Sequence, residues 1–152
     1  MELDELYQNI ILDHSRRPRN AGTIENATAH ARGDNPSCGD EIEVFLKINT
    51  EGKIDDIKFS GQGCAISQAS ASLMTLKIKN KTCKEAFELL TDFNEMILGG
   101  EQSEPPAVLG DLRILKGVRK FPQRVKCATL AWQALRQALQ LTIVELKDKH
   151  KT

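Results

Sequence analysis

Four residues that can bind a metal ion stand in three separate stretches of the chain: Cys38, Asp40, Cys64 and Cys127. Cys38 and Asp40 are two positions apart, and in extended backbone side chains two apart point to the same face. Gly39 between them gives the backbone extra freedom. Thiolate and carboxylate are both ligands that zinc accepts in proteins. This stretch therefore predicts two ligands aimed at one point.

The other two cysteines are expected near the beginnings of helices. Cys64 follows Gly61-Gln62-Gly63 at a strand-to-helix junction, and Cys127 is expected at or near the start of the last helix, after Pro122. A helix N-terminus carries partial positive charge and free N–H groups. Both features lower the pKa of a thiol. We therefore expect each cysteine to be biased toward the thiolate that binds metal.

The charge of such a site predicts basic neighbours. Three thiolates, one carboxylate and a divalent metal carry a net negative charge, which nearby cations stabilise. Residues 112–127 hold no acidic residue and these basic ones: Arg113, Lys116, Arg119, Lys120, Arg124 and Lys126. We expect Arg124 or Lys126 to lie beside the metal, and the run either to dock a partner or to be a solvated face.

The spacing of the cysteines alone leaves a plainer alternative open. The chain has no paired Cys-x-x-Cys motif, the strongest sequence signal for zinc. Buried cysteines often serve only as small core residues. Cys83 lies inside a capping-box pattern and is not expected to be a ligand.

The elements that must position these residues follow from hydrophobic periodicity. Residues 3–11 show the three-and-four spacing of an amphipathic helix that ends near residues 16–20. Alternation over residues 41–48, a turn at 49–52 and a returning strand over 53–60 predict an antiparallel hairpin. Residues 27–33 indicate a further short strand.

The second half of the chain is predicted to be helical. Small residues after Cys64 favour a helix packed closely on the sheet, and Thr82 with Glu85 forms a capping box for a helix through Leu98. A polar connector over residues 101–112, one or two helical turns over 112–118 and a last helix from near Cys127 follow. The fold class is α+β, with a small antiparallel sheet packed against several helices in a single domain, residues 1–152.

Composition narrows the function classes. The 152 residues carry 21 basic and 21 acidic side chains, so no global field favours nucleic acid or a membrane surface. The N-terminus is acidic and no apolar run is long enough to span a bilayer, so a cytoplasmic location with reduced thiols is expected.

Three motifs in order resemble the U-type iron–sulfur scaffold family, the NifU N-terminal and IscU-like proteins, over nearly the whole chain. The motifs are Asn35-Pro36-Ser37-Cys38-Gly39-Asp40, Gly61-Gln62-Gly63-Cys64-Ala65-Ile66-Ser67 and Arg124-Val125-Lys126-Cys127-Ala128. The resemblance implies a three-stranded antiparallel sheet flanked by helices. It also implies that Cys38, Cys64 and Cys127 are the family cysteines and Asp40 the family aspartate.

Two departures resemble the SufU-like, zinc-dependent sulfurtransferase branch. IscU-like proteins have histidine directly before the last cysteine, where this chain has Lys126, and their connector between Cys64 and Cys127 is shorter. The extra length implies a branch-specific insertion around residues 100–120.

What the branch implies is a zinc-bound sulfur acceptor. Cys38 would leave the zinc, take persulfide sulfur from a cysteine desulfurase and pass it to downstream iron–sulfur assembly proteins. Whether such an acceptor counts as an enzyme is left open. One alternative is a scaffold that carries iron as a transient [2Fe–2S] cluster on the same ligands. Another is a structural zinc module that only binds a protein or nucleic acid.

Overall fold

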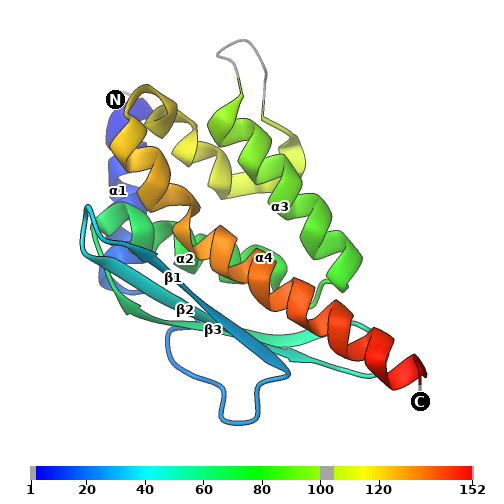
Figure 1. The fold of residues 1–152 in the computed structure, drawn as a ribbon. Coiled ribbons are helices and arrows are strands. Elements are labelled where there is room, and N and C mark those ends of the chain that lie inside the picture. Colours follow the sequence, from blue (N-terminus) through cyan, green and yellow to red (C-terminus); the bar gives the residue numbers. More distant parts are fainter. Residues whose placement is uncertain (1–2, 100–104, 152) are drawn as a thin grey trace.

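The computed structural model describes residues 3–99 and 105–151 of the chain, with side chains described for residues 8–99 and 105–142. Figure 1 shows a small sheet with helices on one side of it. The elements in chain order are α1 (Leu3–Arg16), β1 (Ala29–Asn35), β2 (Asp40–Ile48), β3 (Ile54–Gln62), α2 (Ala65–Ile78), α3 (Cys83–Leu98), η1 (Ala107–Lys120) and α4 (Pro122–Lys151). The predicted α+β class with a three-stranded antiparallel sheet is confirmed.

The sheet has the order β1-β2-β3, with both pairs antiparallel. Alternating residues of the central strand β2, Ile42, Val44 and Leu46, are fully buried. Helices α2 and α4 pack on the face to which these side chains point (Figure 1). The period-two pattern of the sequence therefore marks the inner face of the sheet.

Helix α2 packs closely because its residues are small. Ser70 is fully buried and its hydroxyl donates to the carbonyl oxygen of Ala128 in α4 at 2.6 Å. Trp132 Nε1 donates to the same Ser70 oxygen at 3.1 Å. The Trp132 ring is stacked on Phe93 of α3, with centroids 4.3 Å apart. Helices α2, α3 and α4 thus meet at one buried tryptophan.

The last helix begins earlier than the sequence pattern predicts. Helix α4 starts at Pro122 rather than near Cys127. Proline is favoured at the first helical position, because its missing N–H would have no partner there. The residues that follow Pro122 are mostly polar, so hydrophobic periodicity does not reveal the first turn. Cys127 consequently lies in the second turn.

The connector before α4 is more ordered than predicted. Residues 107–120 form the 3₁₀ helix η1, which is kinked at Gly110 with φ +56°. Part of the predicted connector, residues 100–104, lies outside the described residues. The proposed branch-specific insertion around residues 100–120 remains a prediction.

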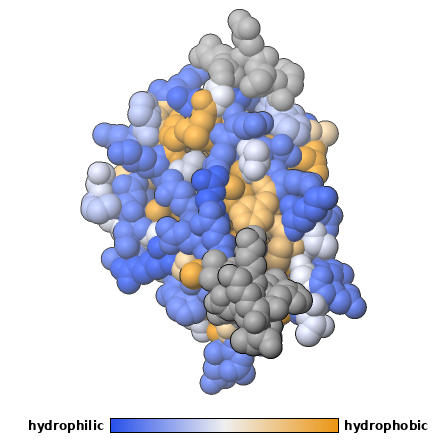
Figure 2. Space-filling model, turned by 45° about the vertical axis from the view of Figure 1, so that its right-hand side comes forward, coloured by the Kyte–Doolittle hydropathy of each residue, from blue (hydrophilic) through white to orange (hydrophobic). Residues whose placement is uncertain are grey.

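The surface is largely polar. Figure 2 shows hydrophilic residues over most of one face, with apolar residues exposed in separate areas. Among the side chains that the structure describes, the exposed large apolar ones are Leu12, Leu76, Leu98, Val108, Phe121 and Leu141. Among the helices that the structure describes, none combines the length and hydrophobicity needed to cross a membrane.

Candidate metal centre

A short turn between β1 and β2 presents the first cysteine. Residues 36–39 form this turn, in which the Cys38 N–H donates to the Asn35 carbonyl oxygen at 3.1 Å. Gly39 has φ +71°, a conformation that glycine adopts without strain. Cys38 is exposed, whereas Asp40, the first residue of β2, is only 1% exposed. The turn therefore holds one accessible thiol next to a buried carboxylate.

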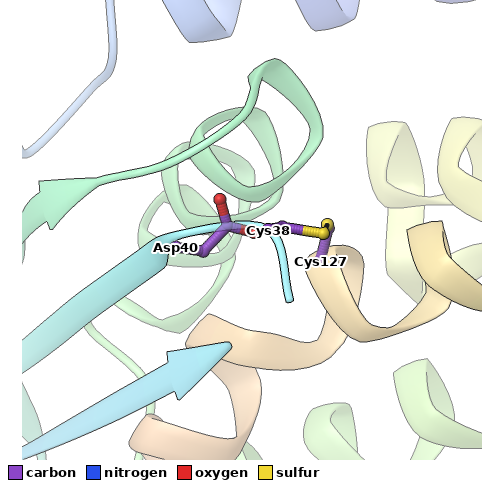
Figure 3. A group of neighbouring side chains, drawn as sticks. All are labelled: Cys38, Asp40 and Cys127. Atoms are coloured by element: carbon purple, nitrogen blue, oxygen red, sulfur yellow. Dashed lines mark hydrogen bonds between the residues drawn. The ribbon is translucent and has the colours of Figure 1, made fainter. Parts of the chain in front are cut away.

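Helix α4 brings Cys127 to the same point (Figure 3). Ligand atoms of Cys38, Asp40 and Cys127 all lie within 4.8 Å of one another. The Sγ atoms of Cys127 and Cys38 are 3.6 Å apart. Cys127 is buried, at 4% exposure, so it forms the inner wall of the group. Two stretches separated by most of the chain thus converge at one point.

Cys64 joins this group through Asp40. Its backbone N–H donates to Asp40 Oδ1 at 2.8 Å, and its Sγ lies 3.9 Å from Asp40 Oδ2. As the N-cap of α2, its sulfur also accepts the Ser67 N–H at 3.5 Å. Cys64 lies outside the group of three whose atoms are all within 4.8 Å, but it contacts the same carboxylate.

Glycine at position 63 allows this approach. A Cβ atom there would collide with Ser67 Oγ and lie 2.7 Å from Asp40 Oδ1, closer than real Cβ contacts allow. The strand-to-helix junction therefore needs glycine so that the carboxylate can reach the Cys64 N–H.

The pKa of the Cys127 thiol is raised, whereas the sequence predicts that it is lowered. Burial raises the pKa of the Cys127 thiol, and its contacts with Asp40, Cys64 and Cys38 raise it further. The predicted lowering by a helix N-terminus is wrong for this residue. The physical reason is its place in the second turn of α4, inside the protein, where desolvation disfavours the charged form.

Asn35 is a site residue that the sequence argument missed. It is 6% exposed and its Nδ2 donates to Cys127 Sγ at 3.9 Å. It is also the strand partner of Asp40, and its carbonyl accepts the Cys38 N–H. Through its side-chain amide and its backbone, one buried residue thus contacts the segments of all three clustered residues. An asparagine at the end of a strand, directly before a cysteine-bearing turn, was the available signal.

The basic residues predicted beside the metal lie on the surface. Arg124 is exposed and Lys126 is exposed. The Arg124 guanidinium lies over the Phe121 ring, 5.9 Å from its centroid. Their placement beside a metal stays a prediction.

The donor set fits a small thiophilic metal ion. Three thiols and one carboxylate are a ligand number and type that suit tetrahedral zinc, and they equally suit iron. Cys38, Asp40 and Cys127 are already close together, and Cys64 lies against Asp40. These observations define a class of protein: a small α+β domain that carries a thiol-rich cluster at one end of its sheet.

Comparison with known proteins places the chain within that class. Residues 6–128 match the family described as NifU-like N terminal domain. The chain belongs to this U-type iron–sulfur scaffold family.

Two curated relatives are almost equally similar to the chain. It is 43% identical to iron–sulfur cluster assembly scaffold protein IscU of Streptococcus pyogenes serotype M1. The match extends over 139 residues, or 91% of this chain and 86% of that relative. It is 42% identical over 137 residues to zinc-dependent sulfurtransferase SufU of Bacillus subtilis strain 168, which covers 90% and 91%.

A solved structure supports the fold. The crystal structure of a putative iron–sulfur cluster assembly scaffold protein for the SUF system from the thermophile Fervidobacterium islandicum AW-1 superimposes with a TM-score of 0.80 at 40% identity, covering 91% of this chain and 99% of that one. Because a scaffold and a sulfurtransferase are matched equally well, the names of the relatives do not by themselves choose between the two activities.

Proposed function

We propose that this chain is a sulfur acceptor in iron–sulfur cluster assembly, which takes persulfide sulfur from a cysteine desulfurase onto Cys38 and passes it on. The observation that carries the proposal is the placement of one exposed thiol, Cys38, against the buried thiol of Cys127 and the buried carboxylate of Asp40. The similarity to a zinc-dependent sulfurtransferase supports it.

The transfer step needs an accessible nucleophile. The Cys38 thiolate attacks the outer sulfur of the desulfurase persulfide, and the bond between the two sulfurs of that persulfide breaks. The desulfurase cysteine leaves as a thiolate, and Cys38 becomes the persulfide. No external oxidant or reductant is consumed, because the transferred sulfur keeps its oxidation state. Attack of an acceptor thiolate on the new outer sulfur repeats the step downstream.

Metal binding would prepare Cys38 for this step. Cys38, Asp40, Cys64 and Cys127 would hold one zinc ion, with Asn35 fixing the orientation of Cys127. A bound zinc ion keeps its thiolate ligands deprotonated at neutral pH. Cys38 is the ligand that can leave, since it sits on an exposed turn while Asp40 and Cys127 are buried. Cys64 is also exposed, but its sulfur is held as the N-cap of α2.

The basic segment before Cys127 is proposed to dock the desulfurase. Arg124 and Lys126 lie three positions and one position before Cys127 in the sequence, and both are exposed. Exposed cations of this kind speed the encounter with an acidic partner surface. Reversing both charges to glutamate is expected to slow association, with a larger effect at low salt than at high salt.

A second candidate activity uses the same ligands. Three thiolates and a carboxylate can also hold a transient [2Fe–2S] cluster, the cargo of a scaffold. The similarity to a cluster assembly scaffold favours this alternative. Anaerobic reconstitution with iron and sulfide tests it: a cluster that moves intact to an apo acceptor supports the scaffold, and a colourless zinc protein argues against it.

The deciding experiment maps sulfur on the chain. The anaerobically purified protein is analysed for metal, mixed with a cysteine desulfurase and free cysteine, and digested for mass spectrometry. We expect one zinc per chain, faster desulfurase turnover and added sulfur on the Cys38 peptide. Cys38→Ala should abolish the stimulation, whereas the control Cys83→Ala should keep it. Stimulation by Cys38→Ala equal to that of the parent would refute the acceptor role.

A further inference from the structure

We propose that Cys127 is a resolving thiol: in the metal-free chain it attacks a persulfide on Cys38, releases the outer sulfur as hydrogen sulfide and leaves a Cys38–Cys127 disulfide. This inference rests on the proposed function, because it requires that sulfur arrives on Cys38. It adds a second outcome for that sulfur, namely release as sulfide instead of transfer to another thiol.

The distance between the two sulfurs supports the reaction. Cys127 Sγ and Cys38 Sγ are 3.6 Å apart, which is contact distance. A disulfide needs the sulfurs at about 2.05 Å, so they must approach by roughly 1.5 Å. Cys38 lies in the exposed turn of residues 36–39, and a Cβ atom added at Gly39 would meet no atom within 4 Å. The turn can therefore supply the movement while α4 stays in place.

The burial of the two residues gives the line of attack. Displacement at sulfur requires the attacking and leaving sulfurs on opposite sides of the sulfur that is attacked. Cys127 lies inside the protein at 4% exposure, whereas Cys38 is exposed. A sulfur added to Cys38 and directed toward solvent is opposite to Cys127. The inner sulfur of the persulfide then faces the Cys127 thiol.

The reaction balances without an added oxidant. A bond forms between the sulfurs of Cys127 and Cys38, and the bond between Cys38 Sγ and the outer sulfur breaks. The outer sulfur is reduced to sulfide and departs as hydrogen sulfide with the proton of the Cys127 thiol and its own. The Cys127 sulfur is oxidised, and the Cys38 sulfur exchanges its bond to the outer sulfur for a bond to Cys127. Because both groups are held in contact, the reaction benefits from a high effective concentration.

The other thiols are less well placed. Cys64 caps α2, where its sulfur accepts the Ser67 N–H and lies against Asp40, outside the closest group of three. Cys83 lies at the start of α3. Cys127 is withdrawn from the reaction whenever it serves as a metal ligand. The persulfide on Cys38 therefore persists while the chain holds its metal, and it is released as sulfide when the chain is metal-free.

The test uses the full chain with Cys83→Ser as background, so that the remote thiol cannot react. The metal is removed by a chelator under anaerobic conditions, and sulfur is added with inorganic polysulfide, whose excess is then removed. Released sulfide is followed with time, and the protein is analysed by mass spectrometry. Parallel samples carry Cys127→Ser or Cys64→Ser, and another sample is reloaded with zinc before sulfur is added.

The metal-free parent is expected to release one sulfide for each sulfur added to Cys38. Its final mass should be lower by two hydrogens than that of the reduced chain before sulfur was added, and the disulfide should map to Cys38 and Cys127. Cys127→Ser should keep the added sulfur, Cys64→Ser should still release it, and zinc should suppress release. A metal-free parent that keeps the Cys38 persulfide, or a disulfide mapped to Cys64, would overturn the proposal. The mapped disulfide in the parent is decisive even if a variant fails to fold.

A second arm separates this inference from the proposed function. Sulfur is supplied by a cysteine desulfurase instead of polysulfide to the zinc-loaded Cys83→Ser chain, in which the proposed ligands are all present and the metal withdraws Cys127 from resolution. If polysulfide loads Cys38 and the desulfurase does not, the acceptor role fails while resolution by Cys127 stands. If both load Cys38 and the parent releases no sulfide, resolution fails while the acceptor role stands.

Discussion

Two helices of this chain begin next to a cysteine, and they are capped in different ways. Helix α3 has Thr82 as its N-cap, in a capping box with Glu85. Helix α2 has Cys64 as its N-cap, with no acidic residue in the first turn. Sulfur is a weak hydrogen-bond acceptor, and the Ser67 N–H lies 3.5 Å from it. The cap of α3 therefore stabilises its helix, whereas the cap of α2 is a weaker one that places a thiol at the site.

The largest expected effect separates these two roles at α2. Serine is among the best N-cap residues, so Cys64→Ser should leave the thermal stability of the metal-free chain equal or higher. Metal affinity should fall more than about 100-fold, because losing even an outer partner of a ligand costs 10- to 100-fold. Zinc competition with a chromophoric chelator and a thermal melt measure the two effects. Unchanged affinity would remove Cys64 from the ligand set.

A second prediction concerns the glycine that precedes the Cys64 cap. In Gly63→Ala the added Cβ would collide with Ser67 Oγ and lie 2.7 Å from Asp40 Oδ1, so both side chains must shift and the contact of Asp40 with the Cys64 N–H is disturbed. We expect weaker metal binding and a cost of about 1–3 kcal/mol in stability, typical of overpacking. Gly117→Ala is the matched control, because no atom lies within 4 Å of its added Cβ. Equal behaviour of the two variants would contradict the role given to Gly63.

At α3 the expected effect is on stability alone. Thr82→Ala removes the acceptor of the Glu85 N–H and should cost about 1 kcal/mol. For a chain of this size that corresponds to a fall in melting temperature of roughly 2–4 °C. Zinc affinity should not change. A large loss of affinity in this variant would show that the two helix starts are coupled.

The smallest effect is a pH dependence at the same capping box. Hydrogen bonds from Thr82 lower the pKa of the Glu85 carboxyl below 4.5. A carboxyl whose pKa is lower in the folded state contributes stability above pH 4.5 and loses it as the pH falls through the lowered value. The stability difference between the parent and Glu85→Ala should therefore shrink as acid unfolding is followed below pH 4.5. A difference that grows toward low pH would contradict this assignment.

The sequence predicted those parts of the fold that depend on local patterns. The alternation along β2 marks its buried residues Ile42, Val44 and Leu46, and the Thr82–Glu85 spacing marks the start of α3. The first turn of α4 was missed, because polar residues follow Pro122 and the apolar stripe begins only near Cys127. Local patterns thus identify elements better than they identify the ends of elements.

The sequence indicates which residue types could form a site, but it does not indicate the environment of those residues. Cys38 and Asp40 could be paired from their spacing, whereas the approach of Cys127 depends on how α4 crosses the sheet. The raised pKa of Cys127 and the contact from Asn35 both follow from burial. The burial of Cys127 and Asn35 results from the packing of distant segments, so no short stretch of sequence predicts it.

The buried contact of Trp132 with Ser70 and Phe93 has a practical consequence. The chain has a single tryptophan, so its fluorescence reports from one known place, where α2, α3 and α4 meet. Trp132 lies on helix α4, which also carries Cys127 about one and a half turns earlier. Emission from this indole can therefore follow, without any added label, whether events at the sulfur-bearing end of α4 loosen the helical layer.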